Sequence, residues 1–346
     1  MINLFENKTP AGKQNKEYHM LSTCSGYSPA KSLIEEISQS FSDKDGNFVE
    51  QFQSTSFYQR LWELFLSELL KEFKLVDISV KQAPDFHLQK NGVDFFLEAT
   101  SSNPADKDEF TDDYIEKALK EKDLKVQKDL IDYYTIKVGS TLKSKLDKKY
   151  WELDWVAGKP LVIGIKPSHN KFANWFPDYK IIEYLYGAGT KNAKNEEGNK
   201  VIENSVLEEH SYKNKKIPSN FFTQPDTENI SAVIWANTCD LHKFNRMAFQ
   251  GKYKTDNIII YRAGKCAGQG SVGQDFMYMV GDSNYKETWA EGVSIFHNPN
   301  AKYPLDKSLF SEVRQMWINE NNEFDELMPK FYPFVSHTEF MEKPKP

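Results

Sequence analysis

The sequence has little cysteine, no long apolar run and no excess of positive charge, and each shortage excludes a class of protein. Its three cysteines, Cys24, Cys239 and Cys266, are odd in number and widely spaced, which excludes a disulfide framework or a cysteine-rich zinc site. No stretch approaches the roughly 20 apolar residues of a transmembrane helix, and residues 1–22 lack the apolar run of a signal peptide. We therefore expect a cytoplasmic protein with no membrane partner.

Charge is nearly balanced over the whole chain but is segregated within it. The 346 residues contain 44 basic and 50 acidic side chains, a net charge of −6, which excludes a wholly basic protein that coats nucleic acid. Residues 101–116 carry six acids and one lysine, whereas residues 117–149 carry ten lysines and five acids. The lysine-rich segment is either a surface that contacts phosphates or the solvated face of a helix.

Apolar periodicity predicts an α/β protein. Apolar residues recur every three or four positions over residues 57–73, which predicts a helix with a wide buried face. Residues 76–80 and 83–100 have strand composition, and Asn91-Gly92 predicts a two-residue turn between two antiparallel strands. One broken helix or two consecutive helices are expected within residues 117–149. Further strands are expected at residues 159–165, 230–235, 257–262, 276–280 and 293–296. This order of elements indicates three layers around a mixed sheet.

Composition also divides the chain into regions. Residues 1–50 are polar, with one expected helix near residues 32–41, and are interpreted as an N-terminal extension. Residues 51–310 are interpreted as a single α/β domain with a loop-rich insertion at about 187–229. A C-terminal helix near residues 311–319 and a tail are expected within residues 311–346.

The turn sets the register of the hairpin and brings two acids together. If Asn91 and Gly92 are the loop residues, Asp85 lies opposite Glu98 on the same side of the sheet. Glu98 lies inside an apolar run, and two buried carboxylates side by side are costly unless a cation joins them. Carboxylate oxygens suit Mg²⁺ or Mn²⁺. Glu63, on the flank of the preceding helix, is either a third ligand or an ordinary boundary residue of an acid-rich helix.

Three segments resemble the motifs of the PD-(D/E)XK nuclease superfamily. They are Trp62-Glu63-Leu64, Ala83-Pro84-Asp85-Phe86 and Phe96-Leu97-Glu98-Ala99-Thr100, in the helix-then-hairpin order of that superfamily's core. The resemblance covers about residues 57–165 and implies a three-layer restriction-endonuclease-like core, with a central mixed β-sheet flanked by helices. It also implies that Asp85, Glu98 and the Ala99 carbonyl bind Mg²⁺ or Mn²⁺, and that Glu63 binds the metal or a water. The implied function is that of a metal-dependent hydrolase acting on DNA or RNA phosphodiesters.

Position 100 departs from the superfamily pattern. Thr100 stands where the motif has lysine, so the positive charge that assists the chemistry must come from elsewhere. Lys81, which shares the strand parity of Asp85, and Lys137 and Lys145, in a segment that resembles a basic helix of bacterial relatives, are the candidates.

Three hypotheses follow. The first is a bacterial Mg²⁺-dependent endonuclease or exonuclease, for which a homodimer is one possible oligomeric state. The second is a catalytically degenerate module on the same fold that binds nucleic acid or protein. An enzyme of unrelated chemistry on another α/β fold is the third, and it would be indicated if residues 83–100 formed no hairpin.

Overall fold

A mixed eight-stranded sheet forms the centre of the molecule. The computed structural model describes residues 2–41, 43–44, 46–102, 109–168, 170, 172–194, 200–236, 238–268 and 271–343. The strand order is β1-β2-β3-β4-β9-β12-β13-β14. These strands are β1 (Val76–Asp77), β2 (Phe86–Lys90), β3 (Val93–Ser102), β4 (Leu161–Pro167), β9 (Ala232–Ala236), β12 (Val293–His297), β13 (Arg314–Ile318) and β14 (Phe324–Leu327). β3, β4 and β9 are mutually parallel, as are β12 and β13, and the remaining neighbours are antiparallel.

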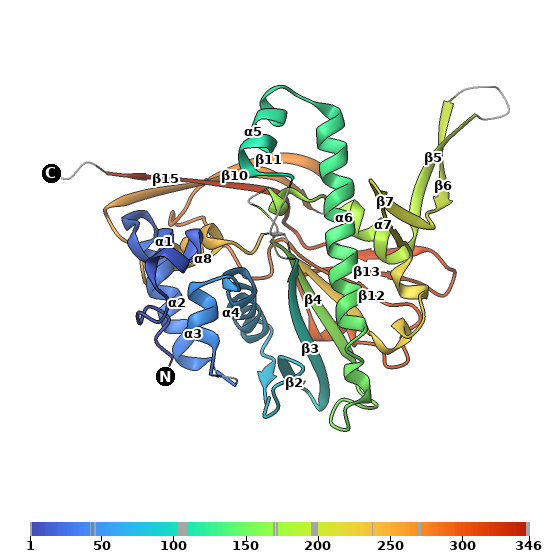
Figure 1. The fold of residues 1–346 in the computed structure, drawn as a ribbon, viewed down its shortest axis with the longest axis horizontal. Coiled ribbons are helices and arrows are strands. Elements are labelled where there is room, and N and C mark those ends of the chain that lie inside the picture. The colour runs from blue at the N-terminus through green and yellow to red at the C-terminus, as the bar shows by residue number, and fades with distance from the viewer. Residues whose placement is uncertain are drawn as a thin grey trace.

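Helices cover both faces of this sheet. The α-helices are α1 (Lys16–Thr23), α2 (Ser28–Ser40), α3 (Phe48–Gln53), α4 (Phe57–Glu72), α5 (Asp112–Lys120), α6 (Leu124–Leu146), α7 (Asp178–Tyr186) and α8 (Leu241–Gln250). Short 3₁₀ helices occur at Ala11–Lys13, Ser25–Tyr27, Tyr150–Glu152, Ala173–Trp175, Phe221–Thr223, Thr227–Asn229 and Lys307–Leu309. In Figure 1, α4 lies on one side of β3 and the long α6 on the other. No helix within the described ranges is both long and apolar enough to cross a membrane.

The alternating side chains of β3 explain this layering. Phe95, Leu97 and Ala99 belong to the hydrophobic core that contains α4, whereas Phe96 belongs to the core that contains α6. Successive side chains of a strand point to opposite faces, so a strand buried on both sides reads as a continuous apolar run. The expected α/β class with a large mixed sheet flanked by helices is confirmed.

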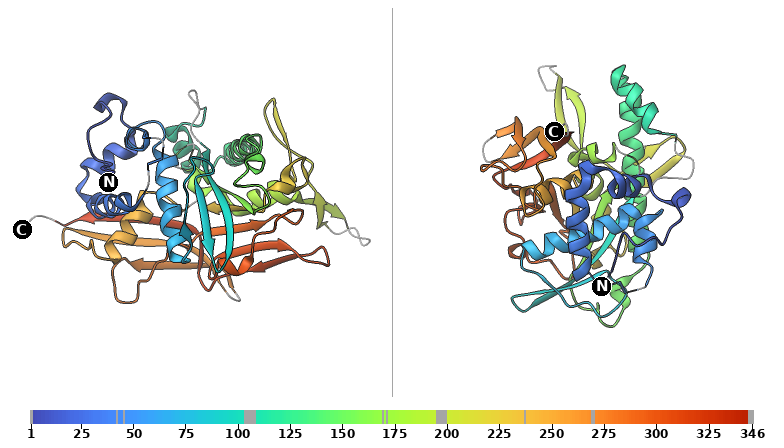
Figure 2. Two further views of the ribbon diagram at one scale, coloured as in Figure 1. Left: turned by 90° about the horizontal axis from the view of Figure 1, so that it is seen from below. Right: turned by 90° about the vertical axis from the view of Figure 1, so that its left-hand side faces the viewer.

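A second sheet and two hairpins are added to this centre. The second sheet has the order β11-β10-β15 and runs beside α1, α2 and α8 (Figure 2). Its strands are β10 (Ile258–Gly268), β11 (Ser271–Met279) and β15 (Tyr332–Glu342), and the hairpins are β5 (Ala188–Lys194) with β6 (Lys200–Val206) and β7 (Glu209–Tyr212) with β8 (Lys215–Pro218). The strands expected near residues 257–262 and 276–280 therefore exist, but they belong to the second sheet and not to the central one.

Several expectations about local structure are confirmed. The helix expected over residues 57–73 is α4, and the strand expected over residues 159–165 is β4. The lysine-rich segment forms two helices, α5 and α6, because the Asp123 side chain accepts hydrogen bonds from the backbone N–H groups of Lys125 and Val126 at 3.0 and 3.1 Å and starts a new helix. Within the acidic segment before α5, Asp106 and Asp108 lie outside the described residues.

Three expectations about the remaining regions need correction. The helix expected over residues 311–319 is wrong: this segment contains β13, which pairs with β12 and β14, so sheet pairing overrides its helical pattern. The expected tail contains β15, and the loop-rich insertion at 187–229 contains the two hairpins. Residues 1–50 contain three helices where one was expected, and Leu4, Tyr18 and Phe48 lie in the same core as α4.

Candidate functional site

The β2–β3 hairpin has the register that the sequence predicts. Lys90 pairs with Val93 and Phe86 with Leu97, while Asn91 and Gly92 have φ values of 53° and 79°, as a two-residue type I′ turn requires. One residue beyond the strand, the backbone N–H of Asp85 donates to Glu98 Oε2 at 3.3 Å.

A second backbone contact fixes the Asp85 carboxylate. The backbone N–H of Ala99 donates to Asp85 Oδ2 at 2.8 Å. Asp85 and Glu98 therefore lie side by side at the open end of the hairpin, held by the backbone.

A cation from α6 contacts Glu98. Glu98 is 5% exposed and shares the strand parity of Phe96, which faces α6. Lys145 Nζ lies 2.6 Å from Glu98 Oε1, and the Tyr150 hydroxyl donates to the same oxygen at 2.7 Å. Burial raises the pKa of Tyr150, and the charge of Glu98 raises it further, so the phenol stays a hydrogen-bond donor. Glu98 Oε1 thus accepts from one charged and one neutral donor.

Glu63 reaches the same edge of the sheet from α4. It is 3% exposed, and its two oxygens accept from Arg60 Nη1 and Gln59 Nε2, each at 2.8 Å. Gln59 Nε2 also donates to the Ala99 carbonyl at 3.1 Å. Gln59 therefore connects the Glu63 carboxylate to β3, while Arg60 neutralises its charge.

The electrostatics of the acids reflect their proximity. Burial raises the pKa of Asp85 well above its ordinary value, and the charges of Glu98 and Glu63 raise it further, against the opposing effects of the Ala99 N–H and Lys145. Burial also raises the pKa of Glu63, although Arg60 and Gln59 oppose this and Glu98 adds to it. The three acids therefore repel one another, and a cation placed among them would relieve that repulsion.

The donor set fits a hard divalent cation in part. Asp85, Glu98 and the Ala99 carbonyl supply the oxygen ligands that Mg²⁺ and Mn²⁺ prefer. In the part of the chain that the structure describes, however, no three His, Cys, Asp or Glu side chains form a metal-binding group. Glu63 is paired with Arg60 and Glu98 with Lys145. The arrangement is therefore a carboxylate pair with a third acid nearby, in which Lys145 contacts one of the two oxygens of Glu98.

Of the three candidate lysines, the structure brings Lys145 to the acids. Lys81 Nζ instead lies 5.1 Å from the centroid of the Trp155 ring, and Lys137 Nζ lies 5.6 Å from that of Tyr133. Thr100, at the motif position, is 4% exposed within β3. The sequence analysis missed Tyr150, which carries no motif signal. Gln59 precedes Glu63 by one helical turn, and this spacing alone predicts that the two lie on one side of α4.

A small cavity opens beside the acids. It has a volume of about 130 Å³ and is lined by Glu63, Asp85, Lys44, Arg60 and Gln82, among others. Lys44 Nζ donates to the backbone carbonyl of Asp85. This cavity is large enough for an ion and a few waters but not for a nucleotide. A second cavity of about 430 Å³ is also lined by Asp85 and Lys44.

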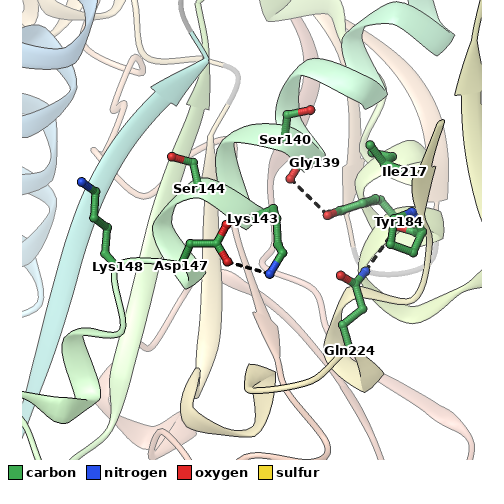
Figure 3. Close-up of a pocket in the computed structure, with 10 residues that line it drawn as sticks. Gly139, Ser140, Lys143, Ser144, Asp147, Lys148, Tyr184, Ile217 and Gln224 are labelled. Carbon is green, nitrogen blue, oxygen red and sulfur yellow. Dashed lines mark hydrogen bonds and ion pairs between the residues drawn. The ribbon is translucent and has the colours of Figure 1, made fainter. Parts of the chain in front are cut away.

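A larger groove of about 500 Å³ follows another face of α6 (Figure 3). Ser140, Ser144 and Tyr184 line it, and none of the three acids does. The Lys143–Asp147 ion pair drawn there, 2.7 Å long, and the Lys128–Asp132 pair, 2.6 Å long, are neutralised within the helix. These two of the ten lysines of residues 117–149 are therefore paired with acids of the same segment.

Comparisons with known proteins give this site no family. No family model matches the chain, and no solved structure matches it. A search of curated proteins found a match to calcium-dependent protein kinase 6 of Plasmodium berghei (strain Anka), 28% identical over 161 residues, which covers 44% of this chain and 10% of that protein. The chain thus spans about a tenth of the length of this relative.

Proposed function

We propose that the chain is a metal-dependent nuclease that hydrolyses phosphodiester bonds of DNA or RNA. The observation that supports this most is the convergence of Asp85 and Glu98 at the end of the β2–β3 hairpin, with Lys145 of α6 at 2.6 Å from Glu98. A restriction-endonuclease-like core, with α4, the hairpin, α6 and β4 as its elements, is part of this proposal. In it, Lys145 takes the role of the motif lysine that Thr100 replaces.

The roles of the residues follow from their contacts. Asp85, Glu98 and the Ala99 carbonyl would hold Mg²⁺ or Mn²⁺, which would lower the pKa of a water and polarise the phosphate. Lys145, released from Glu98, would provide a positive charge next to the phosphate oxygens. Glu63 orients Gln59, which in turn holds the Ala99 carbonyl in place.

The proposal is tested by cleavage of plasmid DNA and of a labelled RNA in 5 mM Mg²⁺ or Mn²⁺, with EDTA as control. We expect cleavage by the wild type, and its loss by at least about 10²-fold in Asp85→Ala and Glu98→Ala with unchanged circular dichroism. Asp94→Asn is the matched control, since Asp94 lies in the same hairpin but pairs with Lys159 at 2.8 Å. Equal cleavage by all four proteins would refute the proposal.

A second function is favoured by one observation. Thr100 is buried at the lysine position of the motif, and the acids are already paired with Lys145 and Arg60. A module that binds nucleic acid or protein without cleaving would need no further cation. Retarded migration of DNA or RNA by wild-type protein with no cleavage in either metal would favour this function.

A further inference from the structure

A second cluster of buried charges lies away from the acids, between α8 and the β11-β10-β15 sheet. Its centre is Glu287, which is fully buried. Lys243 Nζ and Arg246 Nη2, both from α8, lie 2.8 Å from Glu287 Oε1, and Arg246 Nε donates to Oε2 at 2.8 Å. The contacts to these two cations leave few acceptor positions on Glu287.

Arg262 of β10 belongs to the same cluster but is incompletely paired. It is 1% exposed, its Nη1 lies 2.7 Å from Glu291 Oε2 and 3.4 Å from Glu287 Oε1, and its Nε donates to Ser336 at 3.0 Å. Arg262 Nη2 is buried and has no hydrogen-bond partner among the described residues. A buried guanidinium N–H without an acceptor is costly, because it has lost its hydrogen bonds to water without replacement.

The charges of the cluster also leave a place for an anion. Lys243, Arg246 and Arg262 face two carboxylates, those of Glu287 and Glu291. Burial lowers the pKa of Lys243, and the charges of Glu287 and Glu291 oppose this effect. While Lys243 is protonated, the cluster has three positive charges and two negative ones in a region of low dielectric constant. Buried charges are normally balanced, so an acceptor with a negative charge would complete this cluster.

A cavity is lined in part by Arg262. It has a volume of about 180 Å³, and Arg262, Tyr278, Lys286 and Phe331 are among its lining residues. Lys286 is exposed and brings a second positive charge to the cavity. Glu291 lines the cavity too, but its carboxylate is paired with Arg262 Nη1. Because Nη2 is covered, a ligand reaches it only after a side chain of the lining moves.

We propose that this cavity binds a small oxyanion, a phosphate or carboxylate group, through Arg262 Nη2 and Lys286. Arg262 Nη2 has no acceptor among the described residues, and oxyanion oxygens accept charge-assisted hydrogen bonds from such a group. The aromatic rings around Arg262, Phe276 at 5.4 Å and Phe331 at 5.8 Å from its guanidinium carbon, exclude water and strengthen the contact. This site is independent of the proposed nuclease function.

Isothermal titration of the full chain with sodium phosphate and with sodium acetate tests the proposal, with sodium chloride at equal ionic strength as control. We expect one saturable site with a Kd of about 1 mM or tighter, and no saturable heat from chloride. Binding of phosphate alone would identify phosphate-bearing ligands, and binding of acetate alone carboxylate-bearing ones. Absence of saturable binding by both would overturn the proposal.

Variants locate the site. Arg262→Lys keeps the charge near Glu291 but removes the second nitrogen, and we expect it to weaken binding at least tenfold. Lys265→Ala is the matched control on the same strand, because Lys265 is exposed and pairs with Asp275 at 2.7 Å. It should bind like the wild type, and equal binding by Arg262→Lys would overturn the assignment.

A variant at the cavity entrance decides the matter if Arg262→Lys does not fold. Lys286→Glu changes an exposed side chain outside the buried ion pairs, so folding should be unaffected. We expect tenfold weaker oxyanion binding from the reversed charge. Unchanged affinity would contradict the proposal.

Discussion

Two regions of the molecule bury carboxylates with different balances of charge. Around Glu287 and Glu291, three cations face two acids. Burial raises the pKa of Glu287, but Arg246, Lys243 and Arg262 outweigh it and hold that pKa well below the ordinary value. At the end of the β2–β3 hairpin, Arg60 pairs with Glu63 and Lys145 with Glu98, and the pKa values of Asp85 and Glu63 are raised.

The difference separates an ion-pair cluster that supports the fold from a candidate reactive site. Cations around Glu287 join α8, β10 and the segment before β12, so the cluster has a structural reason to exist. Excess acid at Asp85 weakens the fold, because mutually repelling carboxylates are buried without sufficient compensation. Groups kept at such a cost are concentrated at functional sites.

The largest expected effect is on stability. Glu287→Gln should lower the free energy of unfolding by about 3–5 kcal/mol, because it leaves buried cations without their counter-charge. Asp85→Asn should lower the free energy of unfolding by less than about 1 kcal/mol or increase it, because the repulsion between Asp85 and the neighbouring acids is removed. Urea denaturation in EDTA measures both. Equal losses in the two variants would remove the distinction between the regions.

The next effect is on cleavage. Lys145→Ala should reduce Mg²⁺-dependent cleavage about 10²-fold, roughly 2.7 kcal/mol in transition-state stabilisation. Lys137→Ala, on the same helix but placed over Tyr133, should cleave like the wild type. Initial rates on a fluorescent duplex give both values, and an equal decrease in the two variants would exclude a specific role of Lys145.

Metal binding should raise stability at the acid-rich site. At a Mg²⁺ concentration of 100 times Kd, a ligand that binds only the folded state adds about 2.7 kcal/mol. We expect a melting temperature a few °C higher in wild type and no shift in Glu98→Gln. Differential scanning fluorimetry with Mg²⁺, and with equal ionic strength of Na⁺, measures this. A shift of the same size in both proteins would place the metal elsewhere.

The smallest effect is the dependence of the free energy of unfolding on pH, and the sign of this dependence differs between the two regions. Above the ordinary pKa of 3.8, folded protein retains a proton on Asp85 that the unfolded chain releases, so stability falls as pH rises toward the raised pKa. Asp85→Asn should reduce this fall. The contribution of Glu287 is complete above its ordinary value of 4.5 and is lost as pH falls below it. Urea denaturation from about pH 3.5 to 8 measures the free energy of unfolding at each pH, to which Asp85 and Glu287 contribute with opposite slopes. Parallel curves for wild type and Asp85→Asn would contradict the raised pKa of Asp85.

Local signals in the sequence were sufficient for the hairpin and its neighbours. Asn91-Gly92 fixes the number of residues in the turn, so the pairing of Phe86 with Leu97 follows by counting. The periodicity of α4 is equally local. The helix predicted over residues 311–319 was wrong because the strand found there depends on β12 and β14 as partners. No short window of sequence contains those partners.

The sequence limited the lysine that contacts Glu98 to a few candidates but did not decide among them. Lys137 and Lys145 are eight residues apart on α6, about 12 Å along the axis and roughly 80° around it. Only the position of α6 against β3 decides which of them meets Glu98, and that depends on packing far from both. Tyr150 was missed for the same reason, since it follows the helix and approaches Glu98 through tertiary structure.

The two-residue turn at Asn91-Gly92 has a consequence for how this chain tolerates change in length. Because side chains alternate along a strand, one residue added to or removed from one strand of the hairpin would turn Glu98 from α6 toward α4 and separate it from Asp85. A paired change, one residue in each strand, would preserve the opposition. The hairpin therefore keeps Asp85 opposite Glu98 only if both of its strands change in length together. Insertions into one strand would disrupt the site more than substitutions would.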